Sequence, residues 1–227
     1  MHVHLPKPLH GWRAFAGEVG IIVLGVLIAL GAEQVVEMLR WRSEVTSFRK
    51  AIDHELGRNL GIYRSVVVGR ACAARRLAAL ERFLADSTVG KRDKLIRPIG
   101  HPFLQTLYFS AWDNKGGDVT DHLPLDLRIS YGELYDEFRN NEKVLLNERD
   151  VWRSLSQFEQ PVPLDNASQM RMRELLTRAE QFNAAAPVNY QYIVTLARPL
   201  GIRPIADPQF KAPGQSDSFC QSLISQD

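Results

Sequence analysis

The longest apolar stretch of the chain lies near its beginning. Residues 19–32 carry no charged side chain, and apolar residues continue on both sides to give a stretch from residue 14 to residue 36. Its polar members are Glu18, Glu33 and Gln34. These 23 residues would rise about 35 Å as an α-helix, which suffices to cross a bilayer with some tilt. The pattern therefore predicts a transmembrane helix over residues 14–36.

Two other structures fit the central run. Its 14 uncharged residues are short for a span, which needs about 20. They also suit a cleaved signal peptide, with Ala29-Leu30-Gly31 as the cleavage site, or a buried or interfacial helix. The flanks favour the span, because Trp12 and Trp41 lie 29 residues apart, about 43 Å along a helix, close to the bilayer thickness with its headgroups. The predicted interfacial anchors are Trp12, Arg13, Arg40, Trp41 and Arg42.

Small residues share one face of this predicted helix. Gly25, Ala29 and Ala32 are spaced by four and three residues, and Glu18 lies on the same side. Small residues let two membrane helices approach closely, and a carboxyl group at the membrane boundary favours a partner. We expect this face to dock against another membrane helix, either a second copy or another subunit. The alternative is that the small residues have no special role and that Glu18 lies in water at headgroup level.

Helical spacing continues after the apolar stretch. From Val45 to Leu84 the apolar positions recur about every 3.5 residues, and the chain contains no proline between residues 33 and 83. The anchor helix is therefore expected to run into a long helix that leaves the membrane. Gly57, Gly61 and Gly69 weaken it, so a kink or break is expected, and the Asp-Ser-Thr-Val-Gly sequence at residues 86–90 ends it.

Further helices are predicted beyond a proline- and glycine-containing connection at residues 87–102. The first covers residues 103–112, and the turn-forming residues 113–118 follow it. A longer helix begins with Asp121 as N-cap, and Asn141 and Glu148 interrupt its apolar stripe, either as a polar pocket or as a wet side. The stripe consists of Leu127, Tyr131, Leu134, Phe138, Leu145, Trp152 and Leu155.

A last helix is expected over residues 167–197. Asn166 and Gln169 resemble a capping box at its start, and Pro187 is expected to kink or split it. No stretch alternates with period two, so the predicted class is all-α. The expected organisation is an N-terminal tail (1–13), the transmembrane helix (14–36), an extramembrane bundle of about four helices (37–198) and an extended, proline-rich C-terminal tail (199–227).

Composition excludes some classes of function. The 28 basic and 26 acidic residues are intermixed and give a net charge of +2, too balanced for a nucleic-acid-binding protein. The two cysteines, Cys72 and Cys220, form no Cys/His cluster, so no metal site is expected. Either a disulfide joins them, if the domain lies outside the cytoplasm, or both are free thiols.

No catalytic residues are identified. Asp53-His54-Glu55 lacks the second histidine of a zinc-protease helix and is interpreted as a solvated helix face. The acidic turn around Asp113, Asp118 and Asp121 lacks the spacing of a calcium loop and is interpreted as turn formation and capping. We therefore expect neither an enzyme nor a cofactor.

Two segments carry a family resemblance. "FAGEVGIIVLGVLIALGAEQ", followed by the charged helix "SEVTSFRKAIDHELGRNLGIY", resembles the start of a family of uncharacterised bacterial single-pass membrane proteins with a glutamate-led N-terminal anchor and a helical extramembrane domain. "SAWDNKGGDVTDHLPLDLRISYGELYDEF" is similar to a Trp/Gly/Leu/Tyr segment of that family. The resemblance implies a single-pass protein with its domain outside the cytoplasm and supplies no catalytic residues.

The orientation in the membrane has two readings. Lys7 and Arg13 precede the predicted span, whereas four basic residues, Arg40, Arg42, Arg49 and Lys50, follow it, which favours a cytoplasmic domain. A long domain is translocated largely regardless of such charges, and the resemblance favours the periplasm. The sequence thus predicts a bacterial inner-membrane protein with a periplasmic domain.

The predicted role follows from the anchor. We expect an accessory or assembly subunit of a membrane complex, with the bilayer and another membrane protein, or a second copy, as partners. The alternative is a membrane-tethered sensor that binds a small ligand and lacks an output domain of its own.

Overall fold

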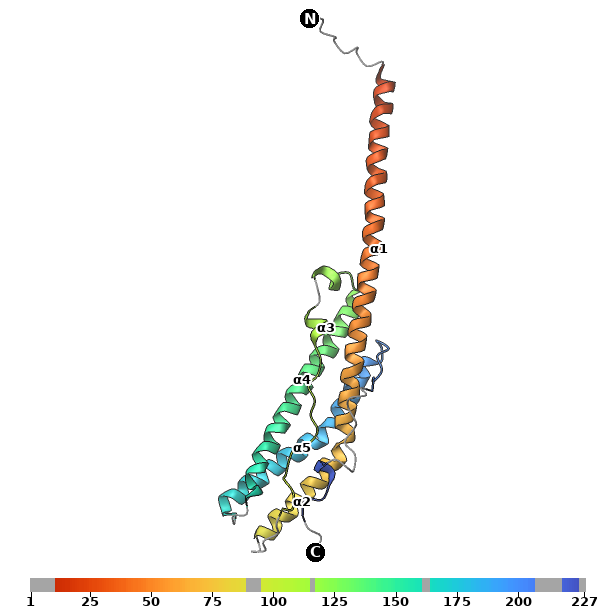
Figure 1. Ribbon diagram of the computed structural model, residues 1–227. Helices are drawn as coiled ribbons and strands as arrows, with labels where there is room; N and C mark the ends of the chain where they lie inside the picture. The colour runs from red at the N-terminus through yellow and green to blue at the C-terminus, as the bar shows by residue number, and fades with distance from the viewer. Residues whose placement is uncertain (1–10, 89–94, 115–116, 161–163, 207–217, 225–227) are drawn as a thin grey trace, which may run out of the picture. The chain divides into compact units, whose positions relative to one another are not determined.

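The described part of the protein is all-α, as predicted. The computed structural model describes residues 11–88, 95–114, 117–160, 164–206 and 218–224, and in these residues it has four long helices, an isolated β-bridge and no strand (Figure 1). The long helices are α1 (Gly11–Val68), α2 (Arg70–Thr88), α4 (Leu125–Leu155) and α5 (Asn166–Ala197). The short elements are α3 (Ser110–Asp113), η1 (Gly117–Thr120), η2 (Ser156–Glu159) and η3 (Ser218–Cys220). The first ten residues of the expected N-terminal tail lie outside the described residues.

The chain forms two compact units. The first comprises residues 1–48 and the second, which we call the domain, comprises residues 49–227. The described part of the first unit is the beginning of α1. Among the described residues, one continuous helical stretch, Gly11–Ser87, is long and apolar enough to cross a membrane by length and composition, and it begins in this unit. The helix is regular across the whole of residues 14–36.

The join between α1 and α2 lies at Gly69. Of the three glycines expected to weaken the long helix, only this one interrupts it. The Gly69 N–H still donates to the Ser65 carbonyl at 3.1 Å, and the Gly69 carbonyl accepts from the N–H of Cys72 at 3.0 Å. Because hydrogen bonds continue on both sides, α2 follows directly from α1 (Figure 1).

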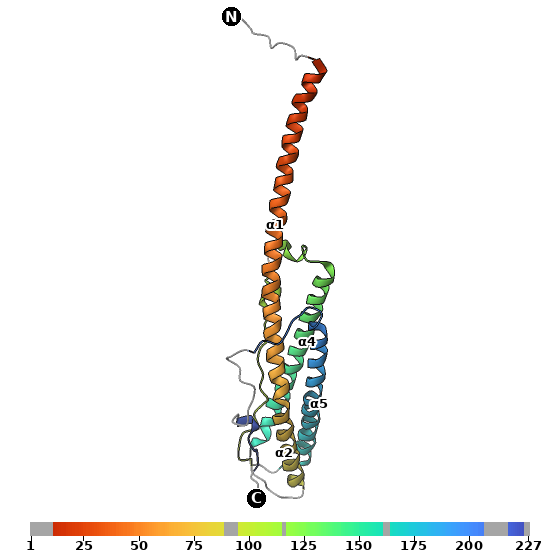
Figure 2. The ribbon, with the colours of Figure 1, turned by 90° about the vertical axis from the view of Figure 1, so that its right-hand side faces the viewer.

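Helix α4 runs parallel to α1 and α2. Hydrogen bonds join Asp53 to Tyr131, Tyr63 to Asn141 and Arg70 to Glu148, and each pair is 78 residues apart in the sequence. A constant separation means that both helices advance in the same direction. Helix α5 returns in the opposite direction and packs against α2 and α4 (Figure 2).

The predicted stripe of α4 faces the core. Leu127 is half-buried, and the other members of the stripe are buried. Part of the core forms one cluster in which α2, α4 and α5 meet, with Leu80, Trp152 and Leu176 among its members. The 3.6-residue spacing therefore identified the packing face of this helix correctly.

An extended strap, residues 95–109, connects α2 with the α3–α4 region. The prediction of a helix over residues 103–112 is wrong, because only Ser110–Asp113 is helical. Side chains of the helices and of η2 form hydrogen bonds with backbone N–H and carbonyl groups of the strap, which would pair with each other if the strap were a helix. Asn59 binds both backbone groups of Tyr108, accepting from its N–H at 2.9 Å and donating to its carbonyl at 2.7 Å. Glu142 accepts from the N–H of Leu107 at 3.2 Å, and Glu159 from that of Ile99 at 2.8 Å.

The starts of α4 and α5 differ from the predicted caps. Helix α4 begins after Pro124 without a side-chain cap, and Asp121 instead accepts from Arg128 at 2.8 Å. Asp165, not Asn166, caps α5 by accepting from the N–H of Ser168 at 2.8 Å. Hydrogen bonds from the side chain and then the backbone of Ser168 lower the pKa of Asp165.

Pro187 does not split α5, which runs unbroken from Asn166 to Ala197. Proline removes one backbone hydrogen bond from a helix, a loss that tertiary packing can offset. Ala186, Ile193 and Ala197 are buried on both sides of the proline, and their packing can offset this loss.

The described parts of the expected C-terminal tail lie against the helices, and they comprise a turn and an irregular segment over residues 199–206 and a segment over residues 218–224 that begins with η3. Gly201, with φ of +73°, turns the chain after α5, and Ile205 then donates its N–H to the Gly57 carbonyl at 2.8 Å. A Cβ on Gly61 would lie 1.9 Å from the Ile205 carbonyl oxygen. The two α1 glycines, one helical turn apart, therefore provide the room for this close approach. Residues 207–217 and 225–227 of the tail lie outside the described residues.

Candidate functional site

The predicted membrane-docking face lies on the first part of α1, whose described side chains are exposed over residues 11–40. Glu18, Gly25, Ala29 and Ala32 are exposed, and so are the described side chains of the predicted anchors except Trp41, which is half-exposed. Trp41 donates to Glu37 at 3.4 Å, and the Arg40 guanidinium lies 5.2 Å from the Trp41 ring centre. The structure shows that these residues lie on one continuous helix. Their roles in docking and in anchoring stay predictions.

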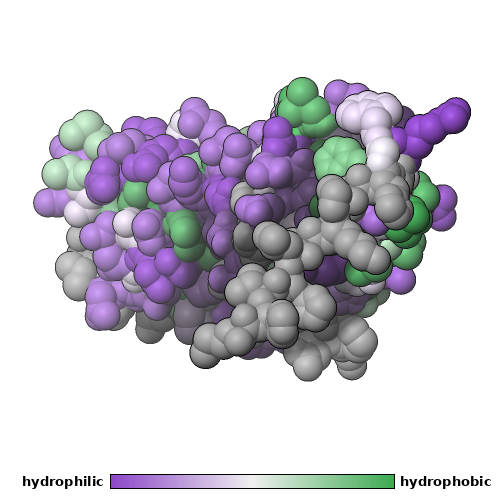
Figure 3. Space-filling model, turned by 90° about the horizontal axis from the view of Figure 1, so that it is seen from above, coloured by the Kyte–Doolittle hydropathy of each residue, from purple (hydrophilic) through white to green (hydrophobic). Residues whose placement is uncertain are grey.

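Exposed apolar side chains are concentrated on this helix. Of the large apolar side chains that are exposed in the described chain, 15 lie between residues 12 and 39, and nine are spread over the domain. Hydrophilic side chains cover much of the face drawn in Figure 3. The domain therefore buries its apolar residues as a water-soluble domain does, whereas the first part of α1 does not.

In the described part of the domain, six polar or charged residues are buried. They are Glu55, Asn59, Arg70, Arg76, Asn141 and Glu148. Arg70 donates to both carboxylate oxygens of Glu148, at 2.5 and 2.9 Å. Asn141 accepts from the Tyr63 hydroxyl at 2.8 Å and donates to Glu137 at 2.7 Å. The two interruptions of the α4 stripe are thus neither a wet side nor an open pocket, because their polar groups bond to α1, α2 and α4.

Glu55 corrects the expectation of a solvated Asp53-His54-Glu55 face. His54 is exposed, but Glu55 is buried and accepts from the Tyr135 hydroxyl at 2.8 Å and from the Ala111 N–H at 2.9 Å. Burial, together with the hydrogen bond to Glu55, raises the pKa of Tyr135 well above its usual range. The usable signal was the four-residue spacing of Glu55, Asn59 and Tyr63, which places all three on the buried face of α1.

The buried tyrosines do not provide an acid or base near neutral pH. Burial raises the pKa of Tyr63 to about 12, and burial with the hydrogen bond to Asp53 raises the pKa of Tyr131 to about 12. General acid–base catalysis favours groups whose pKa lies near the working pH. The hydroxyls of Tyr63 and Tyr131 therefore stay protonated near neutral pH and hold the helices together through their hydrogen bonds.

The acidic turn is occupied by arginines. Asp113 pairs with Arg139, and Asp121 with Arg128. Across the described ranges, no group of three or more His, Cys, Asp or Glu side chains is arranged to hold a metal ion.

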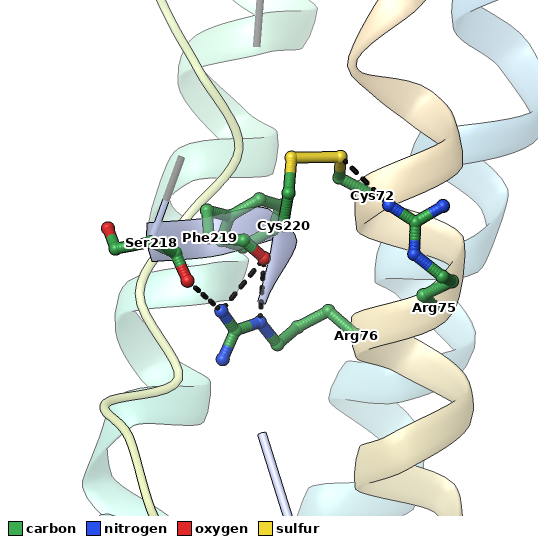
Figure 4. Close-up of a disulfide and its surroundings, with 6 residues drawn as sticks. All are labelled: Cys72, Arg75, Arg76, Ser218, Phe219 and Cys220. Carbon is green, nitrogen blue, oxygen red and sulfur yellow. Dashed lines mark hydrogen bonds between the residues drawn. A yellow bond between two sulfur atoms is a disulfide. The ribbon is translucent and has the colours of Figure 1, made fainter. Parts of the chain in front are cut away.

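The second distinctive site is the disulfide between Cys72 on α2 and Cys220 in η3 (Figure 4). The two residues are 148 positions apart, and they are the only cysteines of the chain. The neighbouring Arg75 places Nη2 3.3 Å from the Cys72 sulfur. The sequence alone is compatible with this bond and with two free thiols.

Arg76 holds the segment that carries Cys220. Its guanidinium donates to the carbonyl of Phe219 at 2.8 Å, to that of Ser218 at 2.9 Å and to that of Pro98 at 3.1 Å. Phe219 packs edge-on against Trp152, with ring centres 5.3 Å apart. Nothing in the sequence pattern pointed to Arg76, because its partners are backbone carbonyls far away along the chain.

No protein-family model, curated protein or solved structure matches the chain. The resemblance to a family of bacterial single-pass membrane proteins therefore stays a prediction.

Proposed function

We propose that the protein is a single-pass membrane protein whose helix α1 crosses the bilayer over residues 14–36 and whose domain serves as an accessory or assembly subunit of a membrane complex. The observation that carries this proposal is the concentration of exposed apolar side chains on residues 12–39. Apolar surface gains about 25 cal/mol for each Å² removed from water, so a helix that is apolar all round favours a lipid or protein environment.

The continuity of α1 supports an anchor over a cleaved signal. The small-residue cleavage site at residues 29–31 lies inside a helix that continues to Val68 and buries Ile52 and Leu56 in the domain. A signal peptide needs no such continuation. A cleaved signal remains the competing outcome, and the mass of the mature protein distinguishes the two.

The disulfide supports a domain outside the cytoplasm. Structural disulfides form and persist in oxidising compartments, and both cysteines of this chain are used in one. This outweighs the small excess of basic residues after the span, since long domains are translocated largely regardless of such charges. We place the domain in the periplasm of a bacterium, and the bacterial assignment rests on the resemblance.

The docking role rests on the Glu18, Gly25, Ala29 and Ala32 face. Within the described chain this face contacts no other element, so lipid or another helix covers it in a membrane. The alternative role, a small-ligand sensor, has less support, because the buried polar residues of the domain bond to one another and to the backbone. We favour a second copy or another membrane protein as the partner.

Topology and docking can be tested in native membranes. Extraction with alkaline carbonate should leave the full-length protein in the membrane fraction. Protease added to cells should cleave the domain only after the outer membrane has been permeabilised. A photo-crosslinking residue at Ala29 should capture a membrane protein, whereas one at Leu27, about 200° away around the helix, should capture less. Release by carbonate would contradict the anchor, and equal capture at both positions would contradict the docking face.

A further inference from the structure

The Cys72–Cys220 disulfide is built asymmetrically. Cys72 is buried in α2 with 6% of its surface exposed, whereas Cys220 is only half-buried, so an attacking thiolate meets Cys220 first. The Arg75 guanidinium lies at the other end of the bond, 3.3 Å from the Cys72 sulfur (Figure 4). The more exposed cysteine of the pair is therefore not the one whose sulfur lies beside a cation.

This asymmetry matches what thiol–disulfide exchange requires. The attacking thiolate needs access to one sulfur, and the reaction is faster when the departing sulfur is stabilised as a thiolate. A neighbouring arginine provides that stabilisation. Attack on Cys220 would expel the Cys72 thiolate beside Arg75, whereas attack on Cys72 would need entry to a buried position.

The segment around Cys220 also covers core residues. Phe219, Leu223 and Ile224 are buried, and Phe219 lies against Trp152. The Ile96 N–H donates to the Leu223 carbonyl at 3.0 Å, which ties the same segment to the strap. Residues 218–224 therefore seal one side of the domain. The disulfide and the hydrogen bonds of Arg76 both hold this segment against the domain.

We propose that the Cys72–Cys220 bond is a reducible latch, opened by a dithiol reductant of the CxxC type that attacks Cys220 and releases residues 218–224 from the domain. The reductant's thiolate forms a mixed disulfide with the Cys220 sulfur, and the electron pair of the broken bond leaves with the Cys72 sulfur. The second thiol of the reductant then displaces the Cys220 thiolate. The reductant ends as a disulfide, and the two electrons and two protons end on Cys72 and Cys220. This inference goes beyond the proposed function and does not depend on membrane insertion.

The direction of attack can be read directly. The full-length protein in mild detergent is treated with glutathione, and free thiols are then alkylated with iodoacetamide and mapped by mass spectrometry. The proposal expects glutathione on Cys220 and the alkyl group on Cys72. The reverse distribution, or an equal one, would overturn it.

The role of Arg75 has a matched control on the same helix. Reduction of Arg75→Gln by thioredoxin should be about three times slower than that of the unchanged protein, because the leaving thiolate loses its cation. Arg82→Gln, which alters an exposed arginine elsewhere on α2, should leave the rate unchanged. Equal rates for both variants would remove Arg75 from the mechanism.

Release of the segment has a separate readout. Amide hydrogen exchange should show that reduction removes the protection of Ile96, whose partner is the Leu223 carbonyl, while amides in the middle of α4 stay protected. Unchanged protection at Ile96 after complete reduction would show that Arg76 alone holds the segment, and this would overturn the latch.

Discussion

Arg70 and Glu148 form a two-bonded ion pair in the interior of the domain, joining the first residue of α2 to the C-terminal third of α4. Their side chains are only 7% and 5% exposed. Removing one partner of such a pair leaves a buried charge without compensation, which typically costs about 3–5 kcal/mol. We expect Glu148→Gln and Arg70→Met each to lower the stability of the domain by about this amount, measured by denaturant unfolding.

Replacing both partners distinguishes the penalty of leaving one buried charge unpaired from the net contribution of the ion pair to stability. The double variant Arg70→Met/Glu148→Leu should recover most of the lost stability, because an apolar pair of similar volume is often as stable as a buried ion pair. Additive losses in the double-mutant cycle would mean that the two side chains do not act through each other.

Gly61 makes room for the segment that follows α5. The Cβ of Gly61→Ala would meet the Ile205 carbonyl oxygen at 1.9 Å, so the segment has to move, at a cost of about 1–3 kcal/mol by thermal unfolding. Gly132→Ala in α4 is the control, because its Cβ would meet Trp112 at 3.7 Å, an ordinary contact. The control should be neutral or more stable by up to about 1 kcal/mol. Equal effects at both positions would argue against the close approach.

Loss of the disulfide should weaken the domain even where the fold persists. The bond closes a chain separation of 148 residues, and removal of a native disulfide typically costs about 2–5 kcal/mol. Cys72→Ser/Cys220→Ser should show this loss in denaturant unfolding, with no further loss on adding a reductant. A reductant that lowers the stability of the double variant as well would act on something other than this bond.

Glu81 on α2 and Glu180 on α5 face each other across the two helices. The hydrogen bond from Glu81, followed by burial and charge repulsion, raises the pKa of Glu180. A raised folded-state pKa stabilises the protein below the unfolded value near 4.5, and that contribution is lost as the pH rises through the folded value.

Removing one of the two charges should therefore help at neutral pH. Glu180→Gln should raise the stability at pH 7 by about 0.5 kcal/mol, a small effect because the pair is largely exposed to solvent. The gain should disappear in acid, where Glu180, whose pKa is raised, is protonated and carries no charge. Glu174→Gln on the same helix, which loses a pair with Arg171, should show no gain.

Local pattern predicted the helices well and their contacts poorly. The 3.5-residue spacing identified the long N-terminal helix, and the apolar stripe identified the buried face of α4. The prediction of a helix within the strap was wrong because the conformation of the strap depends on Asn59, Glu142 and Glu159, which lie far from it in the sequence. Asn141 and Glu148 could not be interpreted alone, since the residues that satisfy them lie 78 positions earlier. Ile205 is also distant in the sequence, so Gly57 and Gly61 were interpreted as residues that weaken the helix, whereas they make room for Ile205.

The constant 78-residue separation between α1–α2 and α4 has a consequence for biosynthesis. Parallel helices cannot be joined by a tight turn, so the chain returns along the domain before α4 begins. At about 5–20 residues per second, the nascent chain waits about 4–16 s between the synthesis of Arg70 and that of Glu148. During translation Tyr63 and Arg70 are thus synthesised several seconds before Asn141 and Glu148, the residues of α4 that form hydrogen bonds with them. The first half of the domain cannot complete its packing until α4 has been synthesised.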